Sequence, residues 1–449
     1  MKIIVCVKVS KGEINHFDKS ALECALQMSD DVTVVSMGPG NCESVLKPLT
    51  RLGAKVVLIS DSVYAGSDTL ATSYVLSTAI KNMQYDVILC GRQSIDGDTA
   101  QVGPMLSYML GCSLITNAMS VTLYGKCIKA VTRTGDESAD FPAVVTLEKG
   151  YVLRFPSIFS KESGIKIIDN SNLCCDVSKC GINGSPTKVL TTYENQTGKR
   201  KCKYISFDDL DEVIKNALSK EQTEEIIPKS CNKLKNVWAV GDAVYKKALE
   251  ISDDVTVISE TDANEIIRMA KQQNPDVILF NADLWGRNIA PLVAAALDTG
   301  LCADCTGLET DGENLFMYRP AMGGNIIAKI KCETKPQMAT VRTKSQSYDI
   351  VVSGGRGIDD IDKLNAFINK YNAQPGASRG LVDEGKAPYE NQIGLTGKTV
   401  SPKVYIAIGI SGAVHHTCAI EGAQTVIAIN PDRDARIFEY ADYGIVDNF

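Results

Sequence analysis

Residues 405–412 read YIAIGISG, an apolar run that passes directly into glycine and serine. Tyr405 to Ile410 has the continuous apolar character of a strand buried on both faces of a sheet. Where such a strand turns into a helix, free backbone N–H groups and the positive end of the helix dipole face the crevice at the end of the sheet. The stretch therefore predicts a doubly wound α/β domain that can hold a phosphate group.

The same pattern of strand followed by polar residues recurs on both sides of this stretch. Residues 351–358 read VVSGGRGI, and residues 424–430 read QTVIAIN. Ser378-Arg379 and residues 392–398 (QIGLTGK) add further hydrogen-bond donors. A nucleophilic serine is disfavoured, because the hydrolase elbow needs a glycine two residues after Ser411, where Ala413 stands. Residues 351–449 are therefore predicted to form a complete nucleotide-binding unit.

Length and composition narrow the class of protein. The chain has 449 residues, which at roughly 150 residues per domain predicts about three domains. A net charge of -7 argues against nucleic acid as the main partner. No apolar run reaches the ~18 residues of a membrane span, and residues 1–10 (MKIIVCVKVS) lack a signal-peptide cleavage pattern. The 15 cysteines are scattered through apolar segments and favour a reducing compartment, so we expect a cytoplasmic protein.

The first part of the chain contains an internal repeat. DVTVVS at residues 31–36 recurs as DVTVIS at 254–259, and DVILC at 86–90 recurs as DVILF at 276–280. Strands alternate with helices around both, so we expect two duplicated Rossmann-like domains with parallel sheets. The loop CGRQSIDGDTAQVGP (90–104) has its DGDTAQ segment only in the first copy. The predicted domains are 1–198, an arm or linker at 199–232, then 233–345 and 346–449.

Metal centres are not predicted. Cys302 and Cys305 form a Cys-x-x-Cys without a second pair at ligand spacing, and Cys174, Cys175 and Cys180 lack a fourth partner. The adjacent histidines His415 and His416 would point apart on a helix.

Six strings in order, GGRGI, GASRGLVDEG, NQIGLTGKTVSP, YIAIGISGAVHH, IAIN and ADYGIVDNF, resemble the FAD domain of the electron-transfer flavoprotein alpha subunit. GRNIAP, TGLCADCTGL, RPAMGGNIIAKI and PQMATVR are similar to the N-terminal domain of that subunit. VCVKVS, VVSMGPG, LCGRQSIDGDTAQVGP, FPAVVTLEKGYVLRFPS and GSPTKVL are similar to the beta subunit. The chain thus resembles a beta-then-alpha fusion. The resemblance implies two adenine nucleotide alpha hydrolase-like domains followed by a doubly wound FAD-binding domain.

The resemblance also implies cofactors and partners. One FAD belongs in the C-terminal domain and a second adenine nucleotide in the beta-like domain. DGDTAQVGP resembles bifurcating members, whereas AMP-binding members tend to have a second acid in place of Gly97, so a second FAD is favoured, with AMP as the alternative. The implied function is flavin-based electron bifurcation with NADH as substrate, and an acyl-CoA dehydrogenase and ferredoxin or flavodoxin as partners. The alternatives are a simple carrier with one FAD and AMP, and a non-redox adenine-nucleotide sensor.

The resemblance supplies the candidate binding residues. For the C-terminal FAD they are Arg356, Ser378, Arg379, Gln392, Ile393, Gly394, Leu395, Thr396, Ser411, Gly412, Ala413, Val414, His415, His416, Asn430, Asp447 and Asn448. For the beta-like site they are Cys6, Asn15, Met37, Gly91, Arg92, Gln93, Asp96, Gly97, Asp98, Thr99, Ala100, Gln101 and Val102.

Three of these residues have implied roles at the flavin ring. Arg379 is expected to lie over the flavin and raise its potential, Thr396 to donate near N5, and His416 to stabilise charge on the pyrimidine. Thr99 and Gln101 are expected to hydrogen-bond a pyrophosphate in the beta-like site.

Two departures from the family pattern stand out. The family usually has glutamine where this chain has His415, which affects the flavin environment. The hairpin usual after the first strand is expected to be missing, with only Lys11 to Asn15 in its place.

Overall fold

The structure is a computed structural model that describes residues 1–194, 199–219, 233–321, 326–343, 348–394 and 397–449. It divides into two compact units. The first unit is Met1–Thr191, Ser230–Met322 and Ala328–Val341, and the second is Thr192–Lys229, Gly323–Ile327 and Arg342–Phe449. Within the described ranges, no helix is both long and apolar enough to cross a membrane.

The first copy of the repeat is built on a nine-stranded sheet with the order β11-β5-β4-β1-β6-β10-β7-β8-β9. Its strands are β1 (Lys2–Cys6), β4 (Asp31–Met37), β5 (Lys55–Ile59), β6 (Val87–Gly91), β7 (Ser113–Tyr124), β8 (Cys127–Thr132), β9 (Gly135–Asp140), β10 (Ala143–Leu147) and β11 (Lys166–Ile168). Pairing is parallel from β11 to β7 and antiparallel from β7 to β9. The central strands are mainly apolar because both faces of the sheet are covered.

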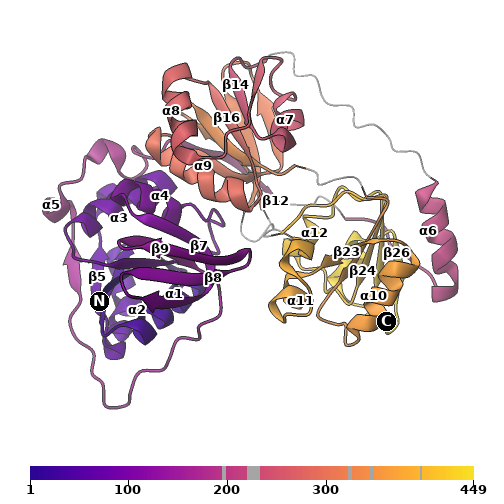
Figure 1. Cartoon of the computed structure of the whole chain (residues 1–449), viewed down its shortest axis with the longest axis horizontal. Coiled ribbons are helices and arrows are strands. Elements are labelled where there is room, and N and C mark those ends of the chain that lie inside the picture. Colours follow the sequence, from indigo (N-terminus) through magenta and orange to yellow (C-terminus); the bar gives the residue numbers. More distant parts are fainter. Residues whose placement is uncertain (195–198, 220–232, 322–325, 344–347, 395–396) are drawn as a thin grey trace. The chain divides into compact units, whose positions relative to one another are not determined.

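Helices cover both faces of this sheet (Figure 1). They are α1 (His16–Met28), α2 (Glu43–Leu46), α3 (Thr69–Lys81), α4 (Val102–Leu110) and α5 (Asn170–Leu173). Leu22 of α1 and Leu46 of α2 belong to one core cluster, whereas Val75 of α3 and Leu106 of α4 belong to the cluster on the other face.

The second copy repeats this topology. Its sheet has the order β15-β14-β16-β21-β17, which matches β4-β1-β6-β10-β7 of the first copy. The strands are β14 (Val237–Val240), β15 (Val255–Ile258), β16 (Val277–Asn281), β17 (Leu301–Cys305) and β21 (Gln337–Val341), and the helices are α7 (Asp242–Ala248), α8 (Ala263–Gln273) and α9 (Leu284–Ala296). A second sheet, β12-β20-β19-β18, contains β12 (Thr187–Glu194), β18 (Gly307–Thr310), β19 (Leu315–Ala321) and β20 (Ile326–Cys332).

A local detail supports the duplication. In the first copy Asn117 has a φ of 56° and its N–H donates to Thr146 Oγ1 over 2.9 Å. In the second copy Asp304 has a φ of 62° and its N–H donates to Thr340 Oγ1 over 2.8 Å. The same bulge therefore occurs at equivalent strands, and the predicted pair of Rossmann-like domains is confirmed.

The C-terminal unit is a parallel sheet with the order β13-β26-β25-β24-β22-β23. Its strands are β13 (Lys203–Tyr204), β22 (Ile350–Gly354), β23 (Gln374–Ala377), β24 (Val404–Ile408), β25 (Thr425–Ile429) and β26 (Tyr443–Ile445). Its helices are α6 (Leu210–Leu218), α10 (Ile361–Lys370), α11 (Arg379–Asp383) and α12 (Val414–Thr417). From β22 to β26 the spatial order is 2-1-3-4-5, a doubly wound arrangement whose switch point lies between β22 and β24.

Two sequence expectations differ from the structure. Residues 199–218 are not merely a linker, because β13 pairs with β26 and α6 packs Leu210, Ile214 and Ala217 into the C-terminal core. The hairpin after β1 is not missing but short. It joins β2 (Val9–Ser10) to β3 (Glu13–Ile14) in antiparallel pairing. Its turn residues Lys11 and Gly12 have φ values of 52° and 77°, as a two-residue turn requires.

Candidate functional site

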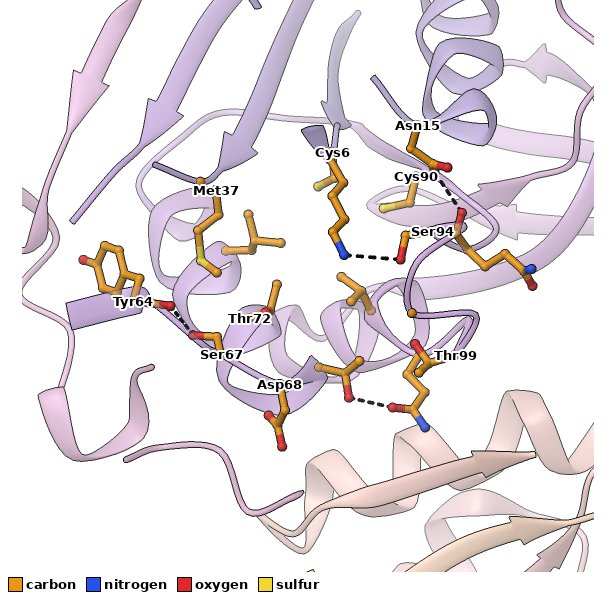
Figure 2. Close-up of a pocket in the computed structure, with 18 of the residues that line it drawn as sticks. Cys6, Asn15, Met37, Tyr64, Ser67, Asp68, Thr72, Cys90, Ser94 and Thr99 are labelled. Carbon is orange, nitrogen blue, oxygen red and sulfur yellow. Dashed lines mark hydrogen bonds between the residues drawn. The ribbon is translucent and has the colours of Figure 1, made fainter. Parts of the chain in front are cut away.

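A cavity of about 1030 Å³ lies at the carboxyl edge of the nine-stranded sheet (Figure 2). Its walls come from the residues that follow β1, β4, β5 and β6 and from the loop before α4. Leu301, Cys302, Arg319 and Ile330 of the second copy close the opposite side. Ligands of open α/β sheets bind outside the carboxyl ends of the strands, so the cavity has the place of a ligand site.

Most residues predicted for the beta-like site line this cavity. They are Cys6, Asn15, Met37, Gly91, Arg92, Gln93, Gly97, Thr99, Ala100, Gln101 and Val102. The two acids Asp96 and Asp98 are not among the lining residues and hold the loop in shape. Asp96 pairs with Lys8 at 2.8 Å, and Asp98 accepts a hydrogen bond from Gln93 Nε2 over 3.0 Å.

The loop between β6 and α4 is fixed by its own turns and by the second copy. Asp98 and Ala100 have positive φ values of 48° and 55°. The Arg319 guanidinium donates to the carbonyl oxygen of Gly97 over 2.9 Å. Gln101 accepts from Thr69 Oγ1 over 2.6 Å and donates to Leu301 O over 3.0 Å. Because both ends of the Gln101 amide are engaged, the side chain joins the loop to α3 and to the second copy. The Nε2 group carries a second N–H, so the expected hydrogen bond to a pyrophosphate is compatible with these contacts.

Asp18 organises the floor of the cavity. Its carboxylate accepts from the backbone N–H of Lys8 over 2.7 Å and from that of Gly91 over 3.1 Å. It therefore ties α1 to the ends of β1 and β6. Burial raises the pKa of Asp18 to about 7, although the two backbone hydrogen bonds and Asn15 oppose the rise. A Cβ on Gly91 would lie 2.2 Å from Asp18 Oδ1, so this position requires glycine.

The segment after β5 was missed by sequence reasoning. The cavity is lined there by Ser60, Asp61, Ser62, Tyr64, Ala65, Gly66, Ser67, Asp68, Thr69 and Thr72. Asp68 caps α3 by accepting from the N–H groups of Leu70 and Ala71, and it also accepts from Thr187 Oγ1 over 2.6 Å. The sequence AGSDT at 65–69 follows an apolar strand and contains this N-cap signal, so the segment was detectable.

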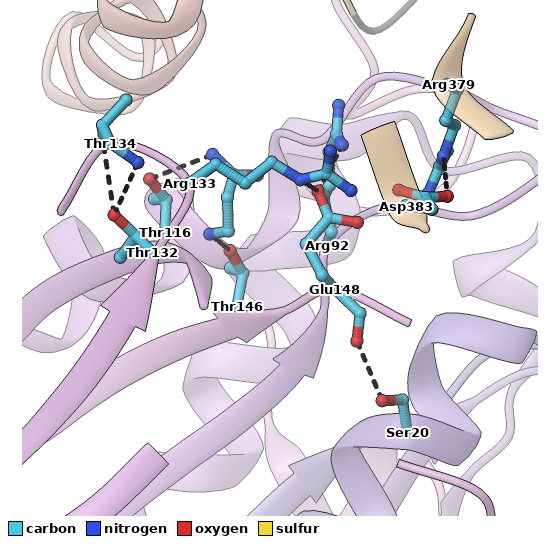
Figure 3. Close-up of polar contacts among 11 residues, drawn as sticks. Ser20, Arg92, Thr116, Thr132, Arg133, Thr134, Thr146, Glu148, Arg379 and Asp383 are labelled. Atoms are coloured by element: carbon cyan, nitrogen blue, oxygen red, sulfur yellow. Dashed lines mark hydrogen bonds and ion pairs between the residues drawn. The ribbon is translucent and has the colours of Figure 1, made fainter. Parts of the chain in front are cut away.

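Arg92 contributes a fixed guanidinium at the cavity wall (Figure 3). It is buried and pairs with Glu148 Oε1 at 2.5 Å, while Arg133 Nε lies 3.5 Å from the same oxygen. The Glu148 carbonyl in turn accepts from Ser20 Oγ over 2.8 Å. These contacts orient the Arg92 side chain before any ligand binds, which reduces the ordering cost of binding an anion.

A second candidate site lies at the carboxyl edge of the C-terminal sheet, at its switch point. Gly355 lies so close to β24 that a Cβ there would stand 2.1 Å from the carbonyl oxygen of Gly409. Gly409 has a φ of 63° and Gly412 a φ of 84°, which side chains rarely adopt. The predicted strand-to-glycine turn therefore exists. The helix that follows, α12, is only one helical turn long, so it has no long helix dipole. What this loop offers a ligand is therefore its backbone N–H donors.

The predicted FAD-binding residues follow the strands of this edge. Arg356 follows β22, Ser378 and Arg379 follow β23, and Gln392, Ile393 and Gly394 lie in the next loop. Ser411, Gly412, Ala413, Val414, His415 and His416 follow β24, Asn430 follows β25, and Asp447 and Asn448 follow β26. Leu395 and Thr396 lie outside the described residues, so the role expected for Thr396 is not placed.

Several of these side chains have definite partners. Arg379 Nε lies 3.2 Å from Asp383 Oδ2, and Arg356 Nε lies 3.3 Å from Glu384 Oε1. Asn430 Nδ2 donates to the Ile410 carbonyl over 2.9 Å. The charges of both arginines are thus partly balanced by carboxylates.

The two adjacent histidines have different environments. His415 is exposed, whereas His416 is buried with Nε2 2.7 Å from the Tyr405 hydroxyl. Burial lowers the pKa of His416 to about 4, so the imidazole is neutral at pH 7.

The cysteine clusters do not assemble a metal site within the described part of the chain. No group of three or more histidine, cysteine, aspartate or glutamate side chains there is arranged to hold a metal ion. Cys302 and Cys305 are buried in β17, and burial together with the Cys302 thiol raises the pKa of Cys305.

Comparison with known proteins gives two family matches. A family model described as the electron transfer flavoprotein domain matches residues 3–153 and again 233–359. A model described as the electron transfer flavoprotein FAD-binding domain matches residues 345–421. One model thus matches in both copies of the repeat, and another covers about half of the C-terminal unit.

Individual relatives match in part of the chain. An electron transfer flavoprotein subunit alpha of Thermoanaerobacterium thermosaccharolyticum is 41% identical over 232 residues, which cover 41% of this chain and 70% of the relative. The subunit alpha of Megasphaera elsdenii is 37% identical over 226 residues, covering 39% of this chain and 67% of the relative. Protein FixB of Clostridium saccharobutylicum is 35% identical over 229 residues, covering 40% and 69%.

Proposed function

We propose that this chain carries electrons with two FAD molecules, on the premise that it belongs to the electron transfer flavoprotein family. One FAD belongs at the carboxyl edge of the C-terminal sheet, and the second belongs in the cavity. In this proposal a beta-like part precedes an alpha-like part in one chain. When bound, a flavin supplies one-electron and two-electron transfer. The residues of the chain bind and orient the flavin and set the charge around it.

The C-terminal edge fits an FAD. Gly355, Gly409 and Gly412 let the loops after β22 and β24 pack closely at this edge, where a Cβ would collide with neighbouring backbone. Their backbone N–H groups are the donors that we assign to the pyrophosphate. Arg356 and Arg379 supply positive charge at the ends of β22 and β23. His416 offers a neutral imidazole held by Tyr405, so its contribution to a reduced flavin would be a hydrogen bond and not a full charge.

The cavity of the first copy is the observation that supports a second FAD. Its volume of about 1030 Å³ lies just above the roughly 300–1,000 Å³ typical of ligand pockets, which favours a dinucleotide over AMP alone. Lys8 and Arg92 place cations on its wall, and Ser67 and Thr99 add hydroxyl groups. Gly97 keeps the loop open where a second acid would repel a pyrophosphate.

A second FAD would allow bifurcation. The proposed reaction is oxidation of NADH with the two electrons divided between an acyl-CoA dehydrogenase and ferredoxin or flavodoxin. The C-terminal FAD serves the dehydrogenase branch. A chain with AMP in the cavity would instead be a simple carrier with one flavin.

An exposed apolar loop is the surface we assign to the dehydrogenase. Val152, Phe155, Ile158 and Phe159 are 87%, 95%, 85% and 86% exposed. Four large apolar side chains this exposed within eight residues are unusual for a surface without a partner. Arg51 holds the loop by donating to the carbonyl oxygens of Ser157 and Ser160 over 3.1 and 3.2 Å. The loop is thus presented in a defined shape, which favours docking of a folded partner.

The absorption spectrum of the purified chain tests the redox part of this proposal. A flavin spectrum that bleaches with dithionite and returns with an electron acceptor is expected. A colourless protein that binds only AMP or ATP would contradict it and favour a nucleotide sensor.

A further inference from the structure

Two thiols lie side by side in the floor of the cavity. Cys6 ends β1, and Cys90 is its registered partner on β6. Both line the cavity, and Figure 2 shows them on neighbouring strands. Both thiols are free in the structure and are 8% and 4% exposed. The cavity gives a reagent from solution a route to both thiols.

The strand register brings the two residues within bonding range. Neighbouring strands are about 4.8 Å apart, inside the ~4.4–6.8 Å separation of Cα atoms in disulfides. Cys6 and Cys90 are the last registered pair between β1 and β6. Beyond them the two strand ends are held by Asp18, which accepts from the N–H groups of Lys8 and Gly91. The Cys6 thiol hydrogen-bonds Cys90 and, with burial and the nearby Asp18, raises the pKa of Cys90.

We propose that Cys6 and Cys90 form a redox-active dithiol that small disulfides, entering through the cavity, convert to an intramolecular disulfide. The Cys6 thiolate attacks a disulfide R–S–S–R and releases one R–SH, leaving a mixed disulfide on Cys6. The Cys90 thiolate then attacks the Cys6 sulfur and releases the second R–SH. Two thiol protons and two electrons of the protein pass to the two R–SH products. Cys6 is assigned to the first attack because it is the more exposed of the two thiols, at 8% against 4%.

The same bond would change nucleotide binding, a consequence that rests on the proposed function. Beyond the thiols, the N–H groups of Lys8 and Gly91 both donate to Asp18, and Lys8, Gly91 and Arg92 continue into the cavity wall. Drawing Cys6 and Cys90 together moves these strand ends. A bound nucleotide in turn covers the thiols. Oxidation and nucleotide binding should therefore oppose each other by the same factor.

The test uses the full chain stripped of nucleotide and treated with 2-hydroxyethyl disulfide. Trypsin places Cys6 in the peptide of residues 3–8 and Cys90 in that of residues 82–92, each with a single cysteine. A disulfide-linked pair of these two peptides is expected, and it should be absent from the Cys6→Ser and Cys90→Ser variants. Cys24→Ser is the matched control, because Cys24 is buried on the opposite face of the sheet, and it should form the link like the parent.

If a variant does not fold, the presence or absence of the linked peptide in the parent protein decides whether the dithiol forms a disulfide. No linked peptide after prolonged treatment overturns the dithiol. If it forms, AMP affinity is compared between oxidised and reduced protein, and about a tenfold loss on oxidation is expected. Equal affinities overturn the coupling. If the reduced protein binds neither AMP nor FAD in the cavity, the proposed function is contradicted. The linked peptide still shows whether Cys6 and Cys90 form a disulfide.

Discussion

The Tyr405 hydroxyl and the His416 imidazole lie 2.7 Å apart in the interior of the C-terminal unit, and both residues are buried. Tyr405 is the second residue of the strand β24 and His416 comes from α12, so this contact fixes the turn that follows the strand. It also keeps a neutral histidine where the resemblance placed a donor to the flavin.

The contact between Tyr405 and His416 predicts that the free energy of unfolding depends on pH. The pKa of His416 is about 4 in the folded protein and near 6.5 when unfolded. Between these values the unfolded state binds more protons, so stability falls as pH drops from about 6.5 to 4. Between pH 7 and 4.5 the parent should therefore lose on the order of 2 kcal/mol more stability than His416→Gln. The difference between the two proteins is the relevant quantity, because Asp18, whose pKa is raised, titrates in the opposite sense in both. Urea unfolding at pH 7 and 4.5 measures it, with His415→Gln as the exposed control. Equal losses in parent and His416→Gln would show that His416 is not the titrating group.

Arg379 and Asp383 predict opposite shifts in the potential of the C-terminal flavin. Their side chains lie 3.2 Å apart. Removing the cation in Arg379→Ala should lower the potential, and removing the carboxylate in Asp383→Ala should raise it, each by on the order of 1 kcal/mol. Spectroelectrochemical titration of both variants checks the signs. Shifts in the same direction, or none, would contradict the place assigned to Arg379.

Substitution of Gly97 by an acidic residue is predicted to change the FAD content of the purified protein. A Cβ on Gly97 meets only Ser94 Oγ, at 3.1 Å, so Gly97→Glu is compatible with the fold but brings a negative charge into the cavity. It should lower FAD content by up to one molecule per chain while the C-terminal FAD remains. Gly164→Glu is the control, since Gly164 has open space around it and does not line the cavity. Unchanged FAD content in Gly97→Glu would argue against FAD in the cavity.

Substitution in the exposed apolar loop of residues 152–159 is predicted to weaken binding of the acyl-CoA dehydrogenase. Phe155→Ser should raise the KM for an acyl-CoA dehydrogenase about tenfold or more, because it removes an apolar anchor from the docking surface. The flavin spectrum and potential should stay as in the parent. Tyr124→Ser, also an exposed aromatic at 69% exposure, is the control. Equal KM values for Phe155→Ser and the parent would place the dehydrogenase elsewhere.

Local patterns predicted a large part of the fold. The echo of DVTVVS in DVTVIS identified β4 and β15, which have the same place in the two sheets. The run before Gly409 identified β24 and its turn because such turns depend on only a few consecutive residues. The beta-like residues came from the resemblance, and most of them lie on one loop between β6 and α4 that lines the cavity.

What sequence did not predict depends on contacts between distant residues. Arg319 meets Gly97, and Thr187 meets Asp68, across separations that no local pattern encodes. Gln101 contacts Thr69 and Leu301, and no local pattern predicts these two partners. Strand β13 is two residues long and exposed, so it is recognised only by its pairing with β26.

Cofactor stoichiometry after purification tests the central claim most directly. The nucleotides released by acid from a known amount of chain are separated and quantified, and the same preparation is assayed for NADH-dependent reduction of ferredoxin. The account predicts two FAD per chain, no AMP, and ferredoxin reduction that requires the acyl-CoA dehydrogenase acceptor. One FAD with one AMP per chain, or no reduction of ferredoxin, would contradict it and leave a carrier with a single flavin.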